Sequence, residues 1–187
     1  MGKLYGEIDE RLRAFIEAQH VFFVATAPSG ASGHPNLSPK GLDTLRILGP
    51  RQVVYLDYVG SGAETIAHLR ENGRIVVMLC AFEGAPRIVR LHGTGRVLEP
   101  QDSDFAELRA RLPADKPARA LIAIHLERIS DSCGYGVPLY QYVGERSQLE
   151  DWSDRKGAAG RLTYQRKHNA KSIDGLPALR WTERDTD

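Results

Sequence analysis

Residues 74–98 read RIVVMLCAFEGAPRIVRLHGTGRVL and predict a long β-hairpin. Two runs rich in Val, Ile and Leu, 74–82 and 87–98, flank a short connection that contains Gly and Pro. Side chains of the second run should alternate between two faces. One face is expected to carry Val89, Leu91 and Val97, and the other Arg90, His92, Thr94 and Arg96. Gly93 and Gly95 predict a bulge, or a close approach by another backbone.

Further strands are predicted on both sides of this hairpin, and no strand–helix–strand alternation runs through the chain. Residues 34–41 hold two prolines, so they favour an edge strand or an ordered loop over a central strand. The other strands are expected at 20–27, 52–58 and 120–129, and helices at 7–19, 62–72 and 102–112. About six short strands with helices at the ends indicate a mainly β (α+β) fold, an antiparallel barrel that is closed or half-open.

Two capping boxes predict where helices begin. Residues 61–64 (SGAE) and 147–150 (SQLE) each place Glu three positions after Ser. The serine hydroxyl would accept from the third amide of the helix, and the glutamate would reach back to the first. Gly73 should end the first of these helices and Gly157 the second. The chain is expected to be a single domain, 1–187, with a helical and basic extension at about 145–187.

Composition excludes several classes of protein. The 187 residues (20.8 kDa) are 42% hydrophobic and 26% charged, which indicates a globular domain. A membrane helix needs about 20 apolar residues, and neither such a run nor a signal-peptide core is found, so we expect a cytoplasmic protein with no membrane partner. The net charge of +1 argues against nucleic acid as a partner. Two distant cysteines argue against a metal site, and Cys80, inside an apolar run, should be a buried thiol.

Three segments carry polar groups suited to an anionic ligand. Residues 36–41 (NLSPKG) offer an amide, a hydroxyl and an ammonium, although a plain surface loop would look the same. Residues 59–65 place glycines at a helix start that could hold an anion, or that could simply be a capped helix. Residues 155–171 have six Lys or Arg and no Asp or Glu, which fits an anionic ligand, an acidic partner surface or a solvated tail. No spacing indicates a catalytic triad or carboxylate pair, so no catalytic residue is assigned.

The order of the segments resembles the pyridoxamine 5'-phosphate oxidase-related family of FMN-binding split barrels. A helix precedes VFFVATA, PNLSPKG, VVYLDY and a Gly-Ser-Gly helix start, and the hairpin, a short helix and a last strand follow. The resemblance covers roughly residues 10–130, and the ending KHNAKSIDGLP, 167–177, is similar to that of one branch of members. It implies a six-stranded antiparallel split β-barrel of the FMN-binding type with flanking helices. It also implies a homodimer with FMN at the subunit interface.

The resemblance further implies which residues hold FMN. They are Asn36, Ser38, Lys40 and Gly41 on the first flavin strand, Tyr55, Leu56 and Asp57 on the next, and Ser61, Gly62 and Thr65 at the following helix start. Three positions differ from the family's oxidases. Residues 61–62 stand in place of an Arg-Lys pair, Ile88 in place of Gln, and 176–179 (LPAL) in place of Arg-Leu-x-Pro. The resemblance therefore implies a flavoprotein but not oxidation of pyridoxamine 5'-phosphate itself.

An FMN-dependent oxidoreductase acting on an unidentified small molecule is the function that the resemblance implies. Two alternatives stay open: a flavin- or haem-binding protein without turnover, and a deazaflavin-dependent reductase on the same barrel. In both enzyme hypotheses the cofactor supplies the redox chemistry while the protein binds and orients it. The homodimer is expected to cover the Tyr and Leu side chains of strand 52–58.

Overall fold

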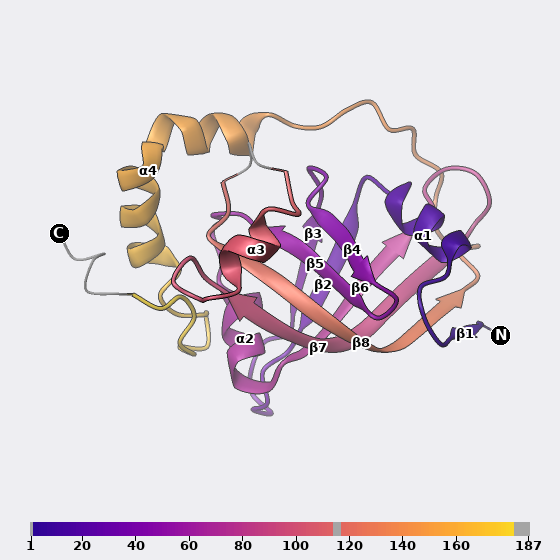
Figure 1. Cartoon of the computed structure of the whole chain (residues 1–187), viewed down its shortest axis with the longest axis horizontal. Coiled ribbons are helices and arrows are strands. Elements are labelled where there is room, and N and C mark those ends of the chain that lie inside the picture. The colour runs from indigo at the N-terminus through magenta and orange to yellow at the C-terminus, as the bar shows by residue number, and fades with distance from the viewer. Residues whose placement is uncertain (1, 114–116, 182–187) are drawn as a thin grey trace.

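One antiparallel sheet of eight strands curls into a half-barrel and forms most of the structure (Figure 1). The structure is a computed structural model that describes residues 2–113 and 117–181. Its strands are β1 (Leu4–Tyr5), β2 (Phe22–Thr26), β3 (Asn36–Lys40), β4 (Leu45–Gly49), β5 (Gln52–Asp57), β6 (Arg74–Cys80), β7 (Ile88–Leu98) and β8 (Ala120–Ser132). The strand order is β3-β2-β6-β7-β8-β5-β4, with β1 paired to β8. The expected mainly β, split-barrel class is therefore confirmed.

Four helices flank the sheet in the described part of the chain. They are α1 (Glu10–Glu17), α2 (Glu64–Asn72), α3 (Phe105–Arg109) and α4 (Gln148–His168). Helix α1 begins where the Asp9 carboxylate accepts a hydrogen bond from the Leu12 amide at 2.8 Å. Helix α2 ends at Gly73 in the left-handed conformation, as predicted. Gly157 has φ 62° and breaks α4, which Figure 1 draws as two limbs.

The hairpin β6–β7 lies at the centre of the sheet. Val77 pairs with Leu91 in its register, and the predicted alternation holds because Val89 and Leu91 are buried. The pairing of β7 with β8 shifts between His92 and Gly93, which confirms the bulge. A Cβ at Gly93 would collide with the backbone of His125, so the predicted close approach is also found.

Two hydrophobic cores pack on opposite faces of the sheet. The larger fills the half-barrel and includes Val53 and Tyr55, while the smaller lies beneath α3 and includes Val54 and Leu56. Strand β5 is therefore buried on both faces. The expectation that a second subunit must cover Tyr55 and Leu56 is wrong, because a single chain leaves them 0% and 1% exposed. Cys80 is buried as predicted.

Several local predictions need correction. The sequence indicates about six strands, whereas the sheet has eight, because β4 and the two-residue β1 carry weak signals. The short segment at 34–41 is indeed an edge strand, β3.

No helix in residues 2–113 and 117–181 combines the length and the apolar character needed to cross a membrane.

Neither capping box forms. Helix α2 begins after Ala63, which makes no side-chain cap hydrogen bond. The Glu64 carboxylate instead accepts a hydrogen bond from the amide of Ile173 at 3.2 Å. It is therefore bound to the C-terminal segment and does not cap the helix. At the start of α4, Ser147 Oγ donates to Asp151 Oδ2 at 2.9 Å rather than capping the helix amides.

Gly93→Ala is expected to lower the free energy of unfolding by about 1–3 kcal/mol, because the added methyl group meets backbone atoms that cannot move aside. Urea unfolding measures the change. Gly49→Ala is the matched control, since a Cβ at this strand glycine meets nothing within 4 Å. Equal midpoints for the two variants would contradict the close packing of β7 on β8.

Candidate functional site

A cavity of about 920 Å³ lies where β3, the end of β5 and the start of α2 come together. The segment that leads into α4 forms a further wall, to which Tyr142, Glu145 and Arg146 contribute. Its volume falls in the range of roughly 300–1,000 Å³ that is typical of small-molecule and cofactor sites. Apolar side chains line part of it: Val21, Pro39, Leu42, Leu56, Val59 and Leu149.

Eight of the ten residues predicted to hold the cofactor line this cavity. They are Asn36, Ser38, Lys40, Gly41, Leu56, Ser61, Gly62 and Thr65. The structure thus brings together three segments that are separate in the sequence. Tyr55 and Asp57 are not among the lining residues. Tyr55 packs in the larger core with its ring 5.5 Å from that of Phe22, and burial raises its pKa well above the ordinary value.

Asp57 lies behind the cavity wall and holds two cations in place. Its side chain is 0% exposed and accepts from Arg119 Nε at 2.7 Å and from Lys40 Nζ at 3.3 Å. Burial by itself would raise the pKa of this carboxyl group, but Arg119 and Lys40 outweigh burial and lower the pKa below its ordinary value. One buried negative charge is therefore shared by two cations, both of which line the cavity.

A second group of hydrogen bonds fixes the polar side chains of β3. Asn36 Nδ2 donates to Thr65 Oγ1 at 3.0 Å, and Ser38 Oγ donates to Asn36 Oδ1 at 3.1 Å. Behind them Thr26 and His68 share a 2.9 Å hydrogen bond. Burial lowers the pKa of His68, so this imidazole is neutral at pH 7. The edge strand is thereby fixed to α2 by uncharged groups.

The first turn of α2 faces the cavity without a side-chain cap. Ser61 and Gly62 precede the helix and line the cavity, and Ala63 supplies no capping oxygen. Amide groups at a helix N-terminus carry partial positive charge and favour an anion. Asn169 supports this turn from the C-terminal segment, where its Nδ2 donates to the Gly60 carbonyl at 3.0 Å.

Two parts of the cavity wall have no local signal in the sequence: Arg119 and the segment before α4. Arg119 lies just before β8, where Asp57 pairs with Ala120 in the register. This pairing of β5 with β8 brings the Arg119 cation next to the Asp57 carboxylate. Tyr142 gives no such signal, because its ring stacks on His20 at 3.6 Å between centroids, more than a hundred residues away in the chain. Among the described residues no group of three or more His, Cys, Asp or Glu is placed to bind a metal.

An antiparallel half-barrel with a partly cationic cavity at its open side is the arrangement of a ligand-binding split barrel. Residues 8–133 match the pyridoxamine 5'-phosphate oxidase family, and the chain belongs to this family. The pyridoxamine 5'-phosphate oxidase family protein ustO of Aspergillus flavus is 38% identical over 198 residues, which cover 97% of this chain and 79% of that protein.

Solved structures share the fold at lower identity. HupZ of Group A Streptococcus aligns with a TM-score of 0.52 and 23% identity, over 67% of this chain and 99% of its own. An FAD-binding protein from Mesorhizobium loti aligns with a TM-score of 0.51 and 15% identity, over 70% of this chain and 96% of its own. At these sequence identities, the two comparisons show a shared fold only.

Asp57→Asn is expected to lower the free energy of unfolding by about 3–5 kcal/mol at pH 7, because it leaves the buried guanidinium of Arg119 without its carboxylate. Since the pKa of Asp57 is lowered in the folded chain, the stability it adds is complete above the unfolded pKa of about 3.9 and is lost as pH falls through the lower folded value. The stability difference between wild type and Asp57→Asn should therefore shrink below about pH 4. Urea titrations between about pH 3 and pH 7 measure it.

Asp104→Asn provides the control, because it removes the partner of Arg96 in an exposed ion pair whose side chains are 50% and 62% exposed. Its unfolding midpoint should stay close to that of wild type at pH 7. An Asp57→Asn midpoint equal to that of this control would show that the buried cluster does not stabilise the fold.

Proposed function

We propose that the chain binds FMN in the cavity between β3, β5 and α2 and acts as an oxidoreductase on a small molecule. The observation that carries this proposal is the pairing, within one cavity, of the Lys40 and Arg119 cations with the uncapped start of α2. Family membership and the flavin named for the Mesorhizobium loti protein support a flavin as the ligand.

The residues of the cavity fit a phosphorylated flavin. Lys40 Nζ and the first amides of α2 offer a positive site for a phosphate, which compensates for the Arg-Lys pair that residues 61–62 lack. Arg119 lines the same cavity and adds a second cation beside Lys40. Leu42 and Leu149 supply apolar surface for a ring system.

The chain's own task in such a reaction is binding and orientation. A bound flavin would supply reversible electron transfer. Asn36 and Ser38 are held by the hydrogen bonds of β3 and can donate or accept at fixed positions along the wall. Tyr142, stacked on His20, and Arg146 form one side of the cavity. No residue is assigned as a catalytic acid or base.

The ligand that copurifies with the protein distinguishes an FMN-binding protein from a haem-binding protein and from a deazaflavin-dependent reductase. FMN gives an absorption band at about 450 nm, whereas haem gives a Soret band. Denaturing release followed by mass spectrometry then distinguishes FMN from FAD and from a deazaflavin. Colourless protein that also fails to bind added FMN would overturn the proposal. Bound flavin with no electron transfer to any acceptor would favour the carrier or sensor alternative.

Lys40→Ala is expected to weaken FMN binding by roughly ten- to a hundredfold, because a charged hydrogen bond contributes about 1.5–3 kcal/mol. Ser61→Ala should weaken it less, since the helix amides remain. Titrating apo-protein with FMN by flavin fluorescence measures both. Lys167→Ala removes the same charge from an exposed position on α4 and should leave the affinity unchanged. Equal affinities for Lys40→Ala and Lys167→Ala would place the phosphate elsewhere.

We also propose that the protein is a homodimer. Large apolar side chains are concentrated and exposed in one segment after β8: Tyr135, Leu139, Tyr140, Tyr142 and Val143, the last at 93%. Exposed apolar side chains that are concentrated in one segment favour a protein contact. A stable interface would bury at least about 1,000 Å² in total.

Light scattering at micromolar concentration is expected to give twice the chain mass of 20.8 kDa. Leu139→Asp together with Val143→Asp should shift the mass to that of one chain, because both side chains are exposed and a charge there opposes burial. Ile173→Asp, at an exposed apolar position outside this segment, is the control. A wild-type mass of one chain would contradict the dimer.

We also propose that the protein is located in the cytoplasm. Cys80 and Cys133 are both free, and Cys133 is exposed. An exposed free thiol suits a reducing compartment, where disulfides are rare.

A further inference from the structure

A second cavity, of about 700 Å³, shares Arg119 with the first. It lies between the second limb of α4, the connection that follows β7 and the C-terminal segment. Three guanidinium groups line it, those of Arg119, Arg161 and Arg180, against a single carboxylate, that of Glu99. Nothing in the flavin proposal uses this cavity.

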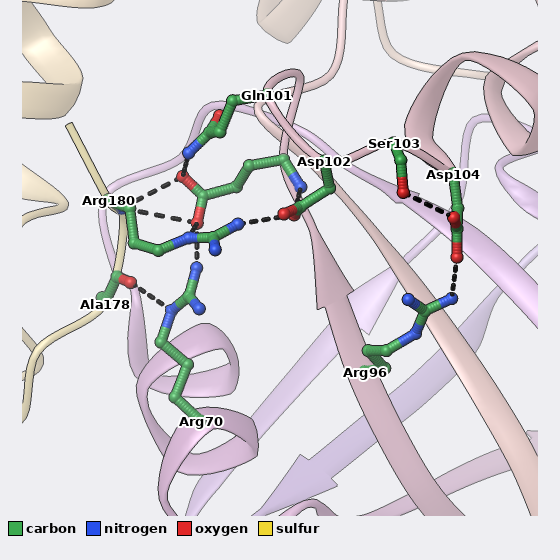
Figure 2. A network of polar contacts seen from close by, with 9 residues as sticks. Arg70, Arg96, Gln101, Asp102, Ser103, Asp104, Ala178 and Arg180 are labelled. Carbon is green, nitrogen blue, oxygen red and sulfur yellow. Dashed lines mark hydrogen bonds and ion pairs between the residues drawn. The ribbon is translucent and has the colours of Figure 1, made fainter. Parts of the chain in front are cut away.

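The Glu99 carboxylate is already saturated by groups of this chain. Arg70, Gln101 and Arg180 donate hydrogen bonds to it, and Figure 2 labels these three donors. The backbone amide of Arg180 also donates to Glu99 Oε2, at 3.0 Å. Glu99 is 2% exposed, so its lone pairs are used within this network and not offered to a ligand. Arg180 is compensated by Glu99 and by Asp102, so the excess positive charge of the cavity comes from Arg161 and Arg119.

Arg119 contributes an unsatisfied donor to this wall. Its side chain is only 4% exposed, and its Nε bonds to Asp57. Its Nη1 has no hydrogen-bond partner among the described residues. Asp57 cannot neutralise it fully, because the same carboxylate also binds Lys40. Buried donors are nearly always paired in proteins, and an anionic oxygen in the cavity would satisfy this one.

Arg161 adds a positioned charge from α4. Its Nη1 donates to the carbonyl of Ser153 at 2.9 Å, which fixes the side chain without neutralising it. No carboxylate within residues 2–113 and 117–181 forms an ion pair with Arg161. The bend at Gly157 separates the limb that carries Arg161 from the limb that contains Ser153.

Part of the remaining wall is apolar, and Gln101 and Gln165 also line it. Leu162, Leu179 and the indole of Trp181 line the cavity beside the cations. A guanidinium group binds a carboxylate in a planar, two-point geometry, and an indole provides a surface for a ring. We propose that this second cavity binds a small organic carboxylate with an aromatic body, at a site distinct from that of the flavin.

Equilibrium dialysis of the full chain against radiolabelled benzoate tests this proposal, with benzyl alcohol and inorganic phosphate as comparison probes. Benzoate is expected to bind saturably, with Kd of about 1 mM, and benzyl alcohol at least tenfold more weakly, because it lacks the charge. Phosphate should lower benzoate binding only weakly, because it offers nothing to the apolar wall and acts only through the shared charge of Arg119. Benzoate binding no tighter than that of benzyl alcohol, or effective competition by phosphate, would overturn the proposal.

Arg161→Gln is the main variant, because Arg161 lines only the second cavity and is not part of the core. It should weaken benzoate binding by about tenfold. Arg155→Gln removes the same charge from an exposed position on α4 and should change nothing. Lys40→Ala removes a cation that lines only the first cavity, and it leaves Asp57 to Arg119 alone, so it should weaken benzoate binding less than Arg161→Gln does. Loss of benzoate binding in Lys40→Ala but not in Arg161→Gln would show that the carboxylate occupies the first cavity, against the proposal.

Arg119→Lys tests the unsatisfied donor directly. Lysine keeps a charge for Asp57 but lacks a second nitrogen, so benzoate affinity should fall by about tenfold while circular dichroism shows an unchanged fold. In a Trp152→Phe background the fluorescence comes from Trp181, and benzoate should change it saturably at the same Kd. A saturable signal with unchanged affinity in both Arg119→Lys and Arg161→Gln would contradict the site.

Discussion

The buried carboxylate of Asp57 closes a sheet that backbone hydrogen bonds leave open. Strand β3 lies at one end of the strand order and β5 next to the other end, so no ladder joins them. The ion pair of Asp57 with Lys40 spans this gap, and its pair with Arg119 ties the same carboxylate to the start of β8. A charge of this kind is expensive to bury unless it is paired, so the position of Asp57 constrains both cations at once. The cavity exists where these constraints meet.

The sequence predicted the central strands well because their signals are local. Alternation over residues 87–98 and the two glycines were enough to place β7 and its bulge. Strand β4 was missed because its five residues are all half-buried and show no alternation. The capping boxes failed for another reason. A motif of four residues cannot show that Glu64 will bind the amide of Ile173, more than a hundred positions away.

The candidate site was also predicted only where its signals are local. Residues near a strand end or a helix start, such as Lys40 and Gly62, can be placed from local pattern and family resemblance, and both line the cavity. Arg119 and Tyr142 could not, because they reach the cavity through strand pairing and through ring stacking on His20. The side chain of Tyr55, which the resemblance places against the flavin, lies in the larger core and does not line the cavity.

Arg119 forms part of the walls of two cavities, and this has a thermodynamic consequence. One guanidinium charge cannot be compensated in full by an anion on each side. An anion held in either cavity lowers the electrostatic potential in the other, and the two binding free energies become coupled with a negative sign. Linkage requires this coupling to be equal in both directions, so each occupant would weaken the other by the same factor. Two ligands that never touch would in this way sense each other through a single side chain.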